Sequence, residues 1–364
     1  MCALKKTFTF EGKRYYVTAQ TEDALYEKLV RKKMELEQGI CRITKNTLVR
    51  AWVEEWLETY KYPSVSSSWY RNIVSICNST ILPEIGSLKV KDVRAIHLQR
   101  VLNSRSGSSK SYSKKVFNIL NEIFREAKRN EMIMNNPADN LVLPKAPSAK
   151  KRRSITPQER KHILAVCETH RGGLFFKIML YCGLRPGEVA ALQACNIDLV
   201  KKTIKVNASI KKDGTIGPPK SEAGNRMVPI PDVLIPSLEA RLKEMDSPFA
   251  FVCTNTRGDR LKTDAIRKMW LSFKYRLNIE MGCKTFKGAL VPPCRVADDL
   301  VPYCLRHTYC TDLQAAGVPI NVARELMGHS DISITARIYT HSSEESFNAA
   351  SESINNLIER RSIV

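Results

Sequence analysis

Residues 145–153 constrain the fold of this chain most strongly, because they divide the sequence into parts that fold separately. They read Lys-Ala-Pro-Ser-Ala-Lys-Lys-Arg-Arg, and proline, serine and consecutive basic residues are typical of an exposed linker. A helix start follows at once, since Thr156, Pro157 and Glu159 form a capping box with proline at the first helical position. We therefore place a linker at 146–153 and a new domain at 154–364.

Basic residues are spread from Lys5 to Arg361 and give the 364-residue chain a formal net charge of +21. An excess of this size and distribution indicates a polyanionic partner. A membrane surface would also attract it, but the sequence has no long apolar run, signal-like segment or lipidation motif. Duplex DNA or RNA therefore fits better, although charge alone names no activity.

The eleven cysteines form no Cys-x-x-Cys pair and show no zinc-ligand spacing with the six histidines. We read them as reduced thiols in a cytoplasm, and we expect neither a metal site nor a cofactor.

The first module, residues 1–43, is predicted to be a small ββα unit. Alternating residues indicate strands at 7–10 and 14–17 around the turn Glu11-Gly12, and a charged helix at 21–38 ends before Gly39. A basic ribbon of this kind can enter a major groove, or it can be a packing appendage.

Residues 44–145 are predicted to form a helical domain. Leu48, Trp52, Trp56 and Tyr60 recur at every fourth position and predict a buried helix face. Further helices are expected at 66–82, 95–102 and 111–130, the first of them closed by Pro83 and Gly86.

In the last domain, an apolar helix at 174–182 ends before Gly183, and Pro186 begins another helix. Arg185 therefore lies on a tight turn, where it cannot move easily into solvent, and Glu188 is a candidate carboxylate to orient it. Strands at 203–206 and 226–230 are joined by a loop that carries Lys220. Taken alone, Lys220 is most simply a solvated loop lysine.

Three helices follow in the C-terminal part. The first opens near Val301 and carries Tyr303, Arg306 and His307. Asn321 is expected to cap the second, which ends at Gly328-His329, and Ser330 or Asp331 to cap a third, which ends at Tyr339. An isolated tyrosine at such a place is usually only amphipathic, half buried with its hydroxyl in water.

The order of these motifs changes that interpretation. Together they resemble the tyrosine recombinase (phage integrase) family, closest in look to the integrases of conjugative transposons and phages. The motifs are Leu-Arg185-Pro-Gly-Glu188, Lys220 on a hairpin loop, Leu-Arg306-His307-Thr, Leu-Met-Gly-His329-Ser and Ile-Tyr339-Thr-His. Each motif is weak alone, but five in the same order and spacing are specific.

The resemblance implies a multidomain, mainly α fold with small β elements. It makes residues 1–43 an arm-type DNA-binding module, 44–145 a core-site DNA-binding domain and 154–364 a mixed α+β catalytic domain. The amphipathic tail at 343–358 is then an exchange helix that docks on a neighbouring protomer. One departure is Tyr303, where the family usually has histidine.

The implied reaction cleaves and rejoins DNA through a 3′-phosphotyrosyl intermediate, without metal or ATP, and integrates or excises a mobile element. Tyr339 is the implied nucleophile, and its phenol is expected to ionise more readily beside two fixed cations. Arg185 and Arg306 would neutralise a phosphorane that carries about two negative charges. His329 adds a donor, and Lys220 is the candidate general acid.

We assign Tyr303 a donor role, and Glu188 and His307 supporting roles. The implied partners are double-stranded DNA at core and arm sites and a homotetramer on that DNA, with an excisionase or a host DNA-bending protein as accessory candidates. The expected location is the cytoplasm of a bacterial host, at the nucleoid. Two alternatives stay open: a type IB topoisomerase, and a non-catalytic basic DNA-binding protein.

Overall fold

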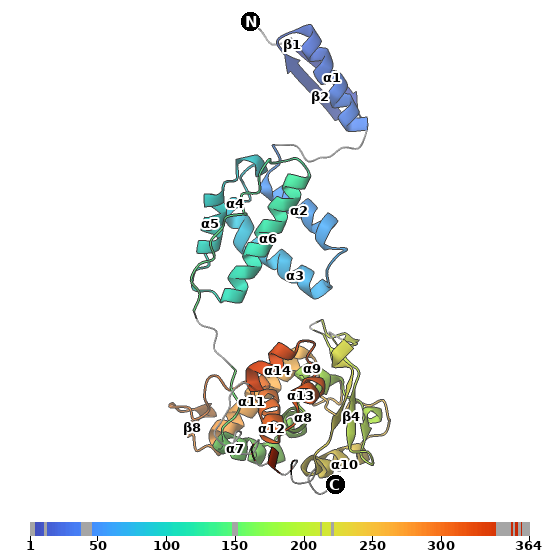
Figure 1. The fold of residues 1–364 in the computed structure, drawn as a ribbon, viewed down its shortest axis with the longest axis vertical. Coiled ribbons are helices and arrows are strands. Elements are labelled where there is room, and N and C mark those ends of the chain that lie inside the picture. Colours follow the sequence, from blue (N-terminus) through green and yellow to red (C-terminus); the bar gives the residue numbers. More distant parts are fainter. Residues whose placement is uncertain are drawn as a thin grey trace. The chain divides into compact units, whose positions relative to one another are not determined.

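The computed structural model describes residues 4–10, 13–37, 46–147, 152–211, 213–219 and 222–339, together with Ser351, Ile354, Asn355 and Ile358 of the tail. The chain divides into two compact units, Met1–Lys150 and Lys151–Val364. Each unit is described by itself (Figure 1).

The chain begins with the ββα arrangement that the sequence predicts. Strands β1 (Leu4–Phe10) and β2 (Lys13–Ala19) pair antiparallel over their full length. Helix α1 (Glu22–Glu37) packs on this ribbon and buries Leu25 and Leu29 against it. The predicted turn at Glu11-Gly12 and the helix stop at Gly39 lie outside the described residues.

The helical domain has its own hydrophobic core. Trp52 and Trp56 are fully buried, as predicted, and the Trp52 indole donates to the Ile123 carbonyl at 3.0 Å. The elements that enclose this core are α2 (Val49–Trp56), π-helical η1 (Leu57–Lys61), α3 (Ser67–Ile76), π-helical η2 (Cys77–Ile81), α4 (Leu82–Ile85), η3 (Val90–Asp92), α5 (Ala95–Asn103) and α6 (Lys110–Arg129).

Two details of this domain differ from the prediction. Leu48 is 44% exposed, because it pairs with Lys89 in an isolated β-bridge and the helix begins one residue later. Pro83 does not end its helix, which continues through a π-helical stretch to Ile85 and ends at the second predicted stop, Gly86. Proline has no N–H, so Pro83 cannot donate to the carbonyl of Ser79, four residues earlier. The Ser79 carbonyl accepts from the Arg105 guanidinium at 2.6 Å instead.

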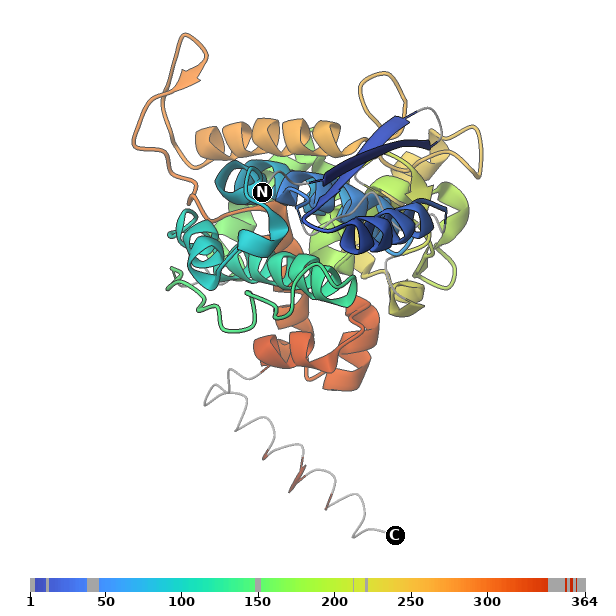
Figure 2. The ribbon, with the colours of Figure 1, turned by 90° about the horizontal axis from the view of Figure 1, so that it is seen from above.

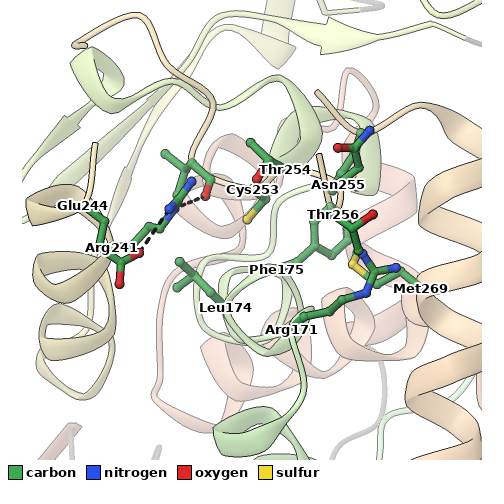
Figure 3. A pocket seen from close by; sticks show the side chains of 12 residues that line it. Arg171, Leu174, Phe175, Arg241, Glu244, Cys253, Thr254, Asn255, Thr256 and Met269 are labelled. Atoms are coloured by element: carbon green, nitrogen blue, oxygen red, sulfur yellow. Dashed lines mark hydrogen bonds and ion pairs between the residues drawn. The ribbon is translucent and has the colours of Figure 1, made fainter. Parts of the chain in front are cut away.

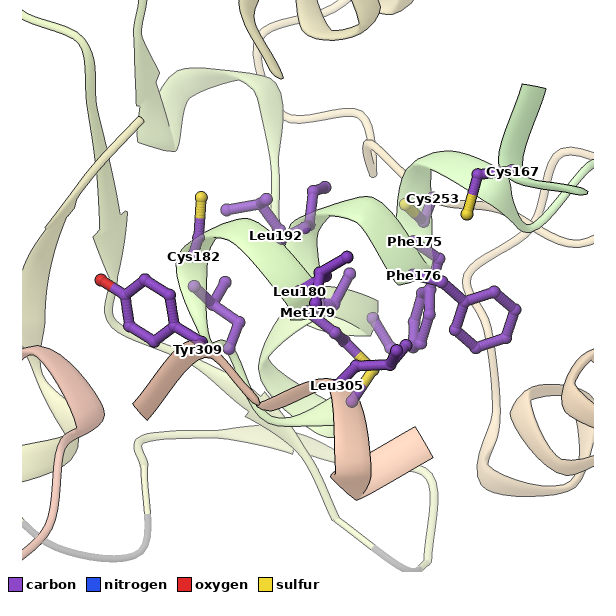
Figure 4. Packing of buried hydrophobic residues seen from close by; sticks show 14 of the residues in the cluster. Cys167, Phe175, Phe176, Met179, Leu180, Cys182, Leu192, Cys253, Leu305 and Tyr309 are labelled. Atoms are coloured by element: carbon purple, nitrogen blue, oxygen red, sulfur yellow. The ribbon is translucent and has the colours of Figure 1, made fainter. Parts of the chain in front are cut away.

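The second unit surrounds the apolar helix α8 (Gly173–Cys182). Figure 4 shows Phe175, Met179 and Cys182 of α8 packed with Leu305 and Tyr309 of α12 (Pro302–Ala315). On another side, Phe176 contacts the Trp270 and Phe273 rings of α11 (Thr263–Glu280). Because α8 is buried almost all round, the turn that follows it is fixed in position.

The remaining elements enclose this core. The sheet order is β3-β4-β7, with both neighbouring pairs antiparallel, and the predicted strands at 203–206 and 226–230 are confirmed as β4 and β7. In chain order the elements are α7 (Pro157–Thr169), α9 (Pro186–Ala191), η4 (Ala194–Asn196), β3 (Ile197–Asp198), β4 (Thr203–Val206), β5 (Ser209–Ile210), β6 (Ile216–Gly217), η5 (Glu222–Gly224), β7 (Arg226–Pro229), η6 (Asp232–Leu234), α10 (Ile235–Lys243), β8 (Thr285–Phe286), β9 (Ala289–Leu290), α13 (Ile320–Met327) and α14 (Ile332–Tyr339). The β8–β9 hairpin projects from the body of the unit (Figure 2).

The helix starts follow the predicted capping signals with one exception. The Thr156 hydroxyl accepts from the Glu159 N–H, and the Asp331 carboxylate accepts from the Ser333 N–H. The prediction that Asn321 caps α13 is wrong, because Pro319 takes the N-cap position and Asn321 lies inside the helix. Most of the tail at 343–358 lies outside the described residues. No helix in the described ranges is both long and apolar enough to cross a membrane.

Candidate active site

A buried carboxylate, that of Glu188 on α9, lies at the centre of the candidate site. It accepts from both Arg185 and Arg226, and the Arg306 guanidinium lies 3.8 Å away. These arginines come from three separate elements: the turn before α9, strand β7 and helix α12. Burial raises the pKa of Glu188, but the Arg226 hydrogen bond and the charges of all three arginines outweigh it and lower the pKa below its ordinary value.

The turn after α8 holds Arg185 as the sequence predicts. Gly183 ends α8 with φ at +63°, and an added Cβ there would lie 2.1 Å from the Tyr309 ring. Arg185 is the N-cap of α9, so its backbone N–H donates to Glu188 at 2.9 Å and its Nη1 donates to the same carboxylate at 2.7 Å. Its side chain is still 33% exposed and can reach a ligand.

Arg306 is held more deeply, on the inner face of α12. Its side chain is only 4% exposed, and its two terminal nitrogens donate to the carbonyls of Gly183 and Met327. Burial, followed by the charge of Arg185, lowers the pKa of Arg306 to about 9. The guanidinium therefore remains mostly charged at neutral pH.

Three successive carbonyls at the C-terminal end of α13 each accept a hydrogen bond from a different arginine. The Leu326 carbonyl accepts from Arg226 at 2.7 Å, that of Met327 from Arg306, and that of Gly328 from Arg185 at 2.8 Å. These carbonyls have no partner within the helix, and the helix dipole places negative charge at them. The end of α13 therefore orients all three arginines.

His329 follows directly after these carbonyls. Its Nδ1 lies 3.0 Å from the Thr335 hydroxyl, and Thr335 is fully buried on α14. Burial and the nearby Arg306 and Arg185 lower the pKa of His329 to about 4. The imidazole is thus neutral at pH 7 and can donate from one ring nitrogen, with its ring fixed by Thr335.

Tyr339 ends α14, as predicted, but its phenol does not have the expected environment. The hydroxyl donates to the Val318 carbonyl at 3.3 Å, in the turn between α12 and α13. Burial and, to a smaller extent, Cys310 raise the pKa of Tyr339 to about 12. The expectation of a lowered pKa is wrong for this arrangement, because the phenol lies against a carbonyl and an apolar wall rather than between two cations.

Tyr303 and His307 share helix α12 with Arg306. The Tyr303 side chain is exposed, and the Arg152 guanidinium lies 4.8 Å from the centre of its ring. Burial and the charge of Arg152 lower the pKa of His307. The predicted general acid Lys220 lies outside the described residues. The structure thus brings Arg185, Glu188, Arg306 and His329 together.

Arg226, the third arginine of the site, is not among the residues predicted from the sequence. The only signal was its position, since the side chains of Arg226 and Val228 point inward from β7 while Met227 and Pro229 point outward. A charged residue at an inward strand position needs a buried partner of opposite charge. That partner, Glu188, is 38 residues earlier in the chain.

A cavity of about 370 Å³ lies elsewhere in this unit, between α8, α10 and α11 (Figure 3). Arg171, Arg241 and Asn255 lie around an apolar floor that includes Phe175 and Met269. Among the candidate site residues that the structure describes, none lines this cavity, so it does not mark the site's chemistry.

Comparison with known proteins places the chain in a family. Residues 153–346 match the phage integrase family, and residues 48–105 match the N-terminal SAM-like domain of phage integrases. The chain is 29% identical to a tyrosine recombinase XerC-like protein of Caldanaerobacter subterraneus, over 98% of this chain and 99% of that protein. It is 26% identical to the transposase from transposon Tn916 of Enterococcus faecalis, over 49% of this chain and 44% of that protein.

Solved structures agree in fold. The Tn1549 transposon integrase in complex with a circular intermediate DNA aligns with a TM-score of 0.65 at 19% identity, covering 84% of this chain and 99% of that one. A lambda integrase dimer bound to a COC′ core site aligns with a TM-score of 0.60 at 15% identity, covering 82% of this chain and 97% of that one.

The match of residues 153–346 to the phage integrase family spans more than half of the chain, so the chain belongs to that family. It is a site-specific recombinase of the tyrosine type. The resemblance and the mainly α fold class predicted from the sequence are confirmed. These comparisons favour recombination over a type IB topoisomerase or a non-catalytic DNA-binding protein.

Proposed function

We propose that this chain cleaves and rejoins double-stranded DNA through a covalent bond to Tyr339, and so integrates or excises a mobile element. The observation that carries the proposal is the convergence of Arg185, Arg306 and His329 around one buried carboxylate. The similarity to a transposon integrase solved with circular intermediate DNA supports the substrate class.

The arginines are suited to a phosphate that gains charge during the reaction. A phosphorane carries about two negative charges on its equatorial oxygens, and preorganised donors stabilise it without rearrangement. Arg185 is the more accessible of the two, and Arg306 is fixed by two backbone carbonyls. Neutral His329 donates a further hydrogen bond without adding charge.

Nucleophilic attack requires the phenol of Tyr339 to leave the Val318 carbonyl and approach the phosphate. The neighbouring guanidinium groups would then lower the phenol's pKa, which burial now holds at about 12. The leaving 5′-oxygen needs a proton, for which Lys220 is our candidate. The phosphotyrosyl ester conserves the bond energy, so rejoining needs no ATP.

Trapping of a covalent complex tests this function. A duplex nicked near the cleaved phosphate loses its short 5′-hydroxyl fragment, which leaves the protein attached to the 3′-phosphate end. We expect the adduct to form in excess chelator and without ATP, because the charge that stabilises the phosphorane comes from arginine. If no adduct forms on any nicked duplex carrying the element's ends, the proposed activity is wrong.

Tyr303→Phe tests the proposed donor role of this side chain. Removal of one preorganised donor costs on the order of 100-fold in rate, whereas removal of a hydroxyl from a ring that only packs costs little. The expected result is single-turnover cleavage slower by one to two orders of magnitude with unchanged DNA affinity. Retention of activity in Tyr303→His is the control, and a phenylalanine variant as fast as the parent would leave Tyr303 a packing role beneath Arg152.

We further propose that the N-terminal ββα unit binds arm sites, whereas the helical domain binds core sites. A chain that starts at Asn46 keeps the helical core, because the Trp52 and Ile123 contacts lie within residues 46–147. This truncated chain should cleave core-site DNA at the parental rate and assemble about tenfold more weakly on DNA that also carries arm sites. Equal assembly of both chains on the longer DNA would contradict the arm-binding role.

Assembly into a homotetramer on paired sites is also proposed, with the tail at 343–358 docking on a neighbouring protomer. Ile354 and Ile358 are exposed, and such side chains are suited to burial against a partner. Sedimentation of the complex on paired sites measures its mass, and a complex that never exceeds two protomers would exclude the tetramer. An excisionase or a host DNA-bending protein would act on the same complex at the bacterial nucleoid, and co-sedimentation tests each of them.

A further inference from the structure

Among the three arginines of the site, Arg226 has the most deeply buried side chain, with 1% of it exposed. Its two terminal nitrogens face the two oxygens of Glu188, at 2.9 and 3.3 Å. Its Nε donates to the Leu326 carbonyl at 2.7 Å, and its Nη1 also lies 3.1 Å from the Gly224 carbonyl. All three nitrogens of this guanidinium face Glu188 or a backbone carbonyl, so its effect on the reaction passes through its neighbours.

The charges around Glu188 show what that effect is. Arg185 and Arg306 also face this carboxylate, at 2.7 and 3.8 Å. Without Arg226, the carboxylate would neutralise one of the two arginines that meet the phosphate, because charges at these distances interact strongly where water is excluded. With Arg226 present, the cluster retains an excess of two positive charges, which matches the phosphorane.

The contacts of Arg226 also join segments that are distant in sequence. Gly224 ends the loop that carries Lys220, Leu326 precedes Gly328 and His329, and Glu188 orients Arg185. Gly328 leaves space for the guanidinium: its φ is +61°, and an added Cβ would lie 2.8 Å from Arg226 Nη1. A single side chain therefore sets the spacing of three parts of the site.

We propose that Arg226 is a positioning residue for DNA cleavage, which balances the charge of Glu188 so that Arg185 and Arg306 keep their full charge for the phosphate. The inference rests on the proposed roles of these two arginines. It predicts that the charge of Arg226 matters only while Glu188 is a carboxylate. Glutamine at position 188 retains one acceptor for Arg185 and removes the charge that Arg226 balances.

The test compares Arg226→Gln with the double variant Arg226→Gln/Glu188→Gln in single-turnover cleavage of a nicked duplex. The single variant leaves the carboxylate to the other two arginines, so we expect cleavage about 100-fold slower than in the parent. The double variant restores the charge excess and should cleave within roughly tenfold of the parent. DNA affinity and its salt dependence should be the same in all three proteins, because Arg226 reaches no phosphate.

The control is Arg241→Gln, which removes a guanidinium that bonds Glu244 and the Val252 carbonyl in the same unit, away from the site. It should cleave at the parental rate.

An Arg226→Gln variant as fast as the parent, or a double variant as slow as Arg226→Gln, would overturn the inference. If Arg226→Gln does not fold, the double variant alone decides, because it buries no unbalanced charge: a rate within tenfold of the parent supports the inference and a slower one overturns it. Absence of an adduct with the parent would instead refute the proposed function.

Discussion

Tyr339→Phe is expected to bind DNA with parental affinity and to form no covalent adduct. The change removes one oxygen, the only atom of this side chain that can bond phosphorus. The ring keeps its packing against the catalytic core, and the lost hydrogen bond to the Val318 carbonyl is long, at 3.3 Å. Denaturing electrophoresis of the trapped DNA should therefore show adduct formation reduced by roughly 10⁴-fold or more, limited by detection.

A matched control separates loss of the nucleophile from loss of a tyrosine hydroxyl in general. The Tyr275 hydroxyl on α11 also donates to a backbone carbonyl, that of Gly288, at 3.1 Å. Tyr275→Phe removes the same atom from a similar contact and should form adduct at the parental rate. Adduct in Tyr339→Phe, mapped by peptide sequencing to another residue, would refute the assignment.

The sequence predicts Arg185, Arg306 and His329 because each lies in a local motif whose order carries information. It also predicts Glu188 beside Arg185, since three residues at the start of a helix bring the two side chains together. Arg226 could not be predicted in this way, because its partner is 38 residues earlier and the pairing arises only when β7 packs against α9 and α13.

The environment of Tyr339 was beyond sequence reasoning for a similar reason. Its pKa depends on what surrounds the hydroxyl, and the turn at Val318 is brought there by the packing of α12, α13 and α14. Pro83 shows the same limit in the helical domain. Whether a proline ends a helix depends on whether another donor reaches the vacant carbonyl, and Arg105 does so from 26 residues away.

Arg306→Lys is expected to slow cleavage by roughly 1,000-fold at pH 7.5, although the substitution is nominally conservative. Arg306 spans the carbonyls of Gly183 and Met327 with two nitrogens of a rigid planar fork, and lysine offers one nitrogen on a flexible stem instead. Charge is lost as well. The surroundings lower the arginine's pKa from 12.5 to about 9, and a lysine, whose ordinary pKa is about 10.4, would lose roughly half of its charge by pH 7 and most of it by pH 8 in the same surroundings.

The pH dependence then has opposite signs in the parent and the variant. In the parent, cleavage should rise with pH, because the attacking phenol must lose its proton while Arg306 stays charged up to about pH 9. In Arg306→Lys, the lysine regains its charge only as the pH falls, so cleavage should increase from pH 8 to pH 6.

Arg185→Lys is the matched control, because position 185 is 33% exposed and a lysine there keeps its charge. It should cleave more slowly than the parent but with the parental pH dependence. Single-turnover rates of the three proteins between pH 6 and pH 9 measure this difference. If Arg306→Lys follows the parental profile, burial does not control the charge at position 306, and the loss must come from geometry alone.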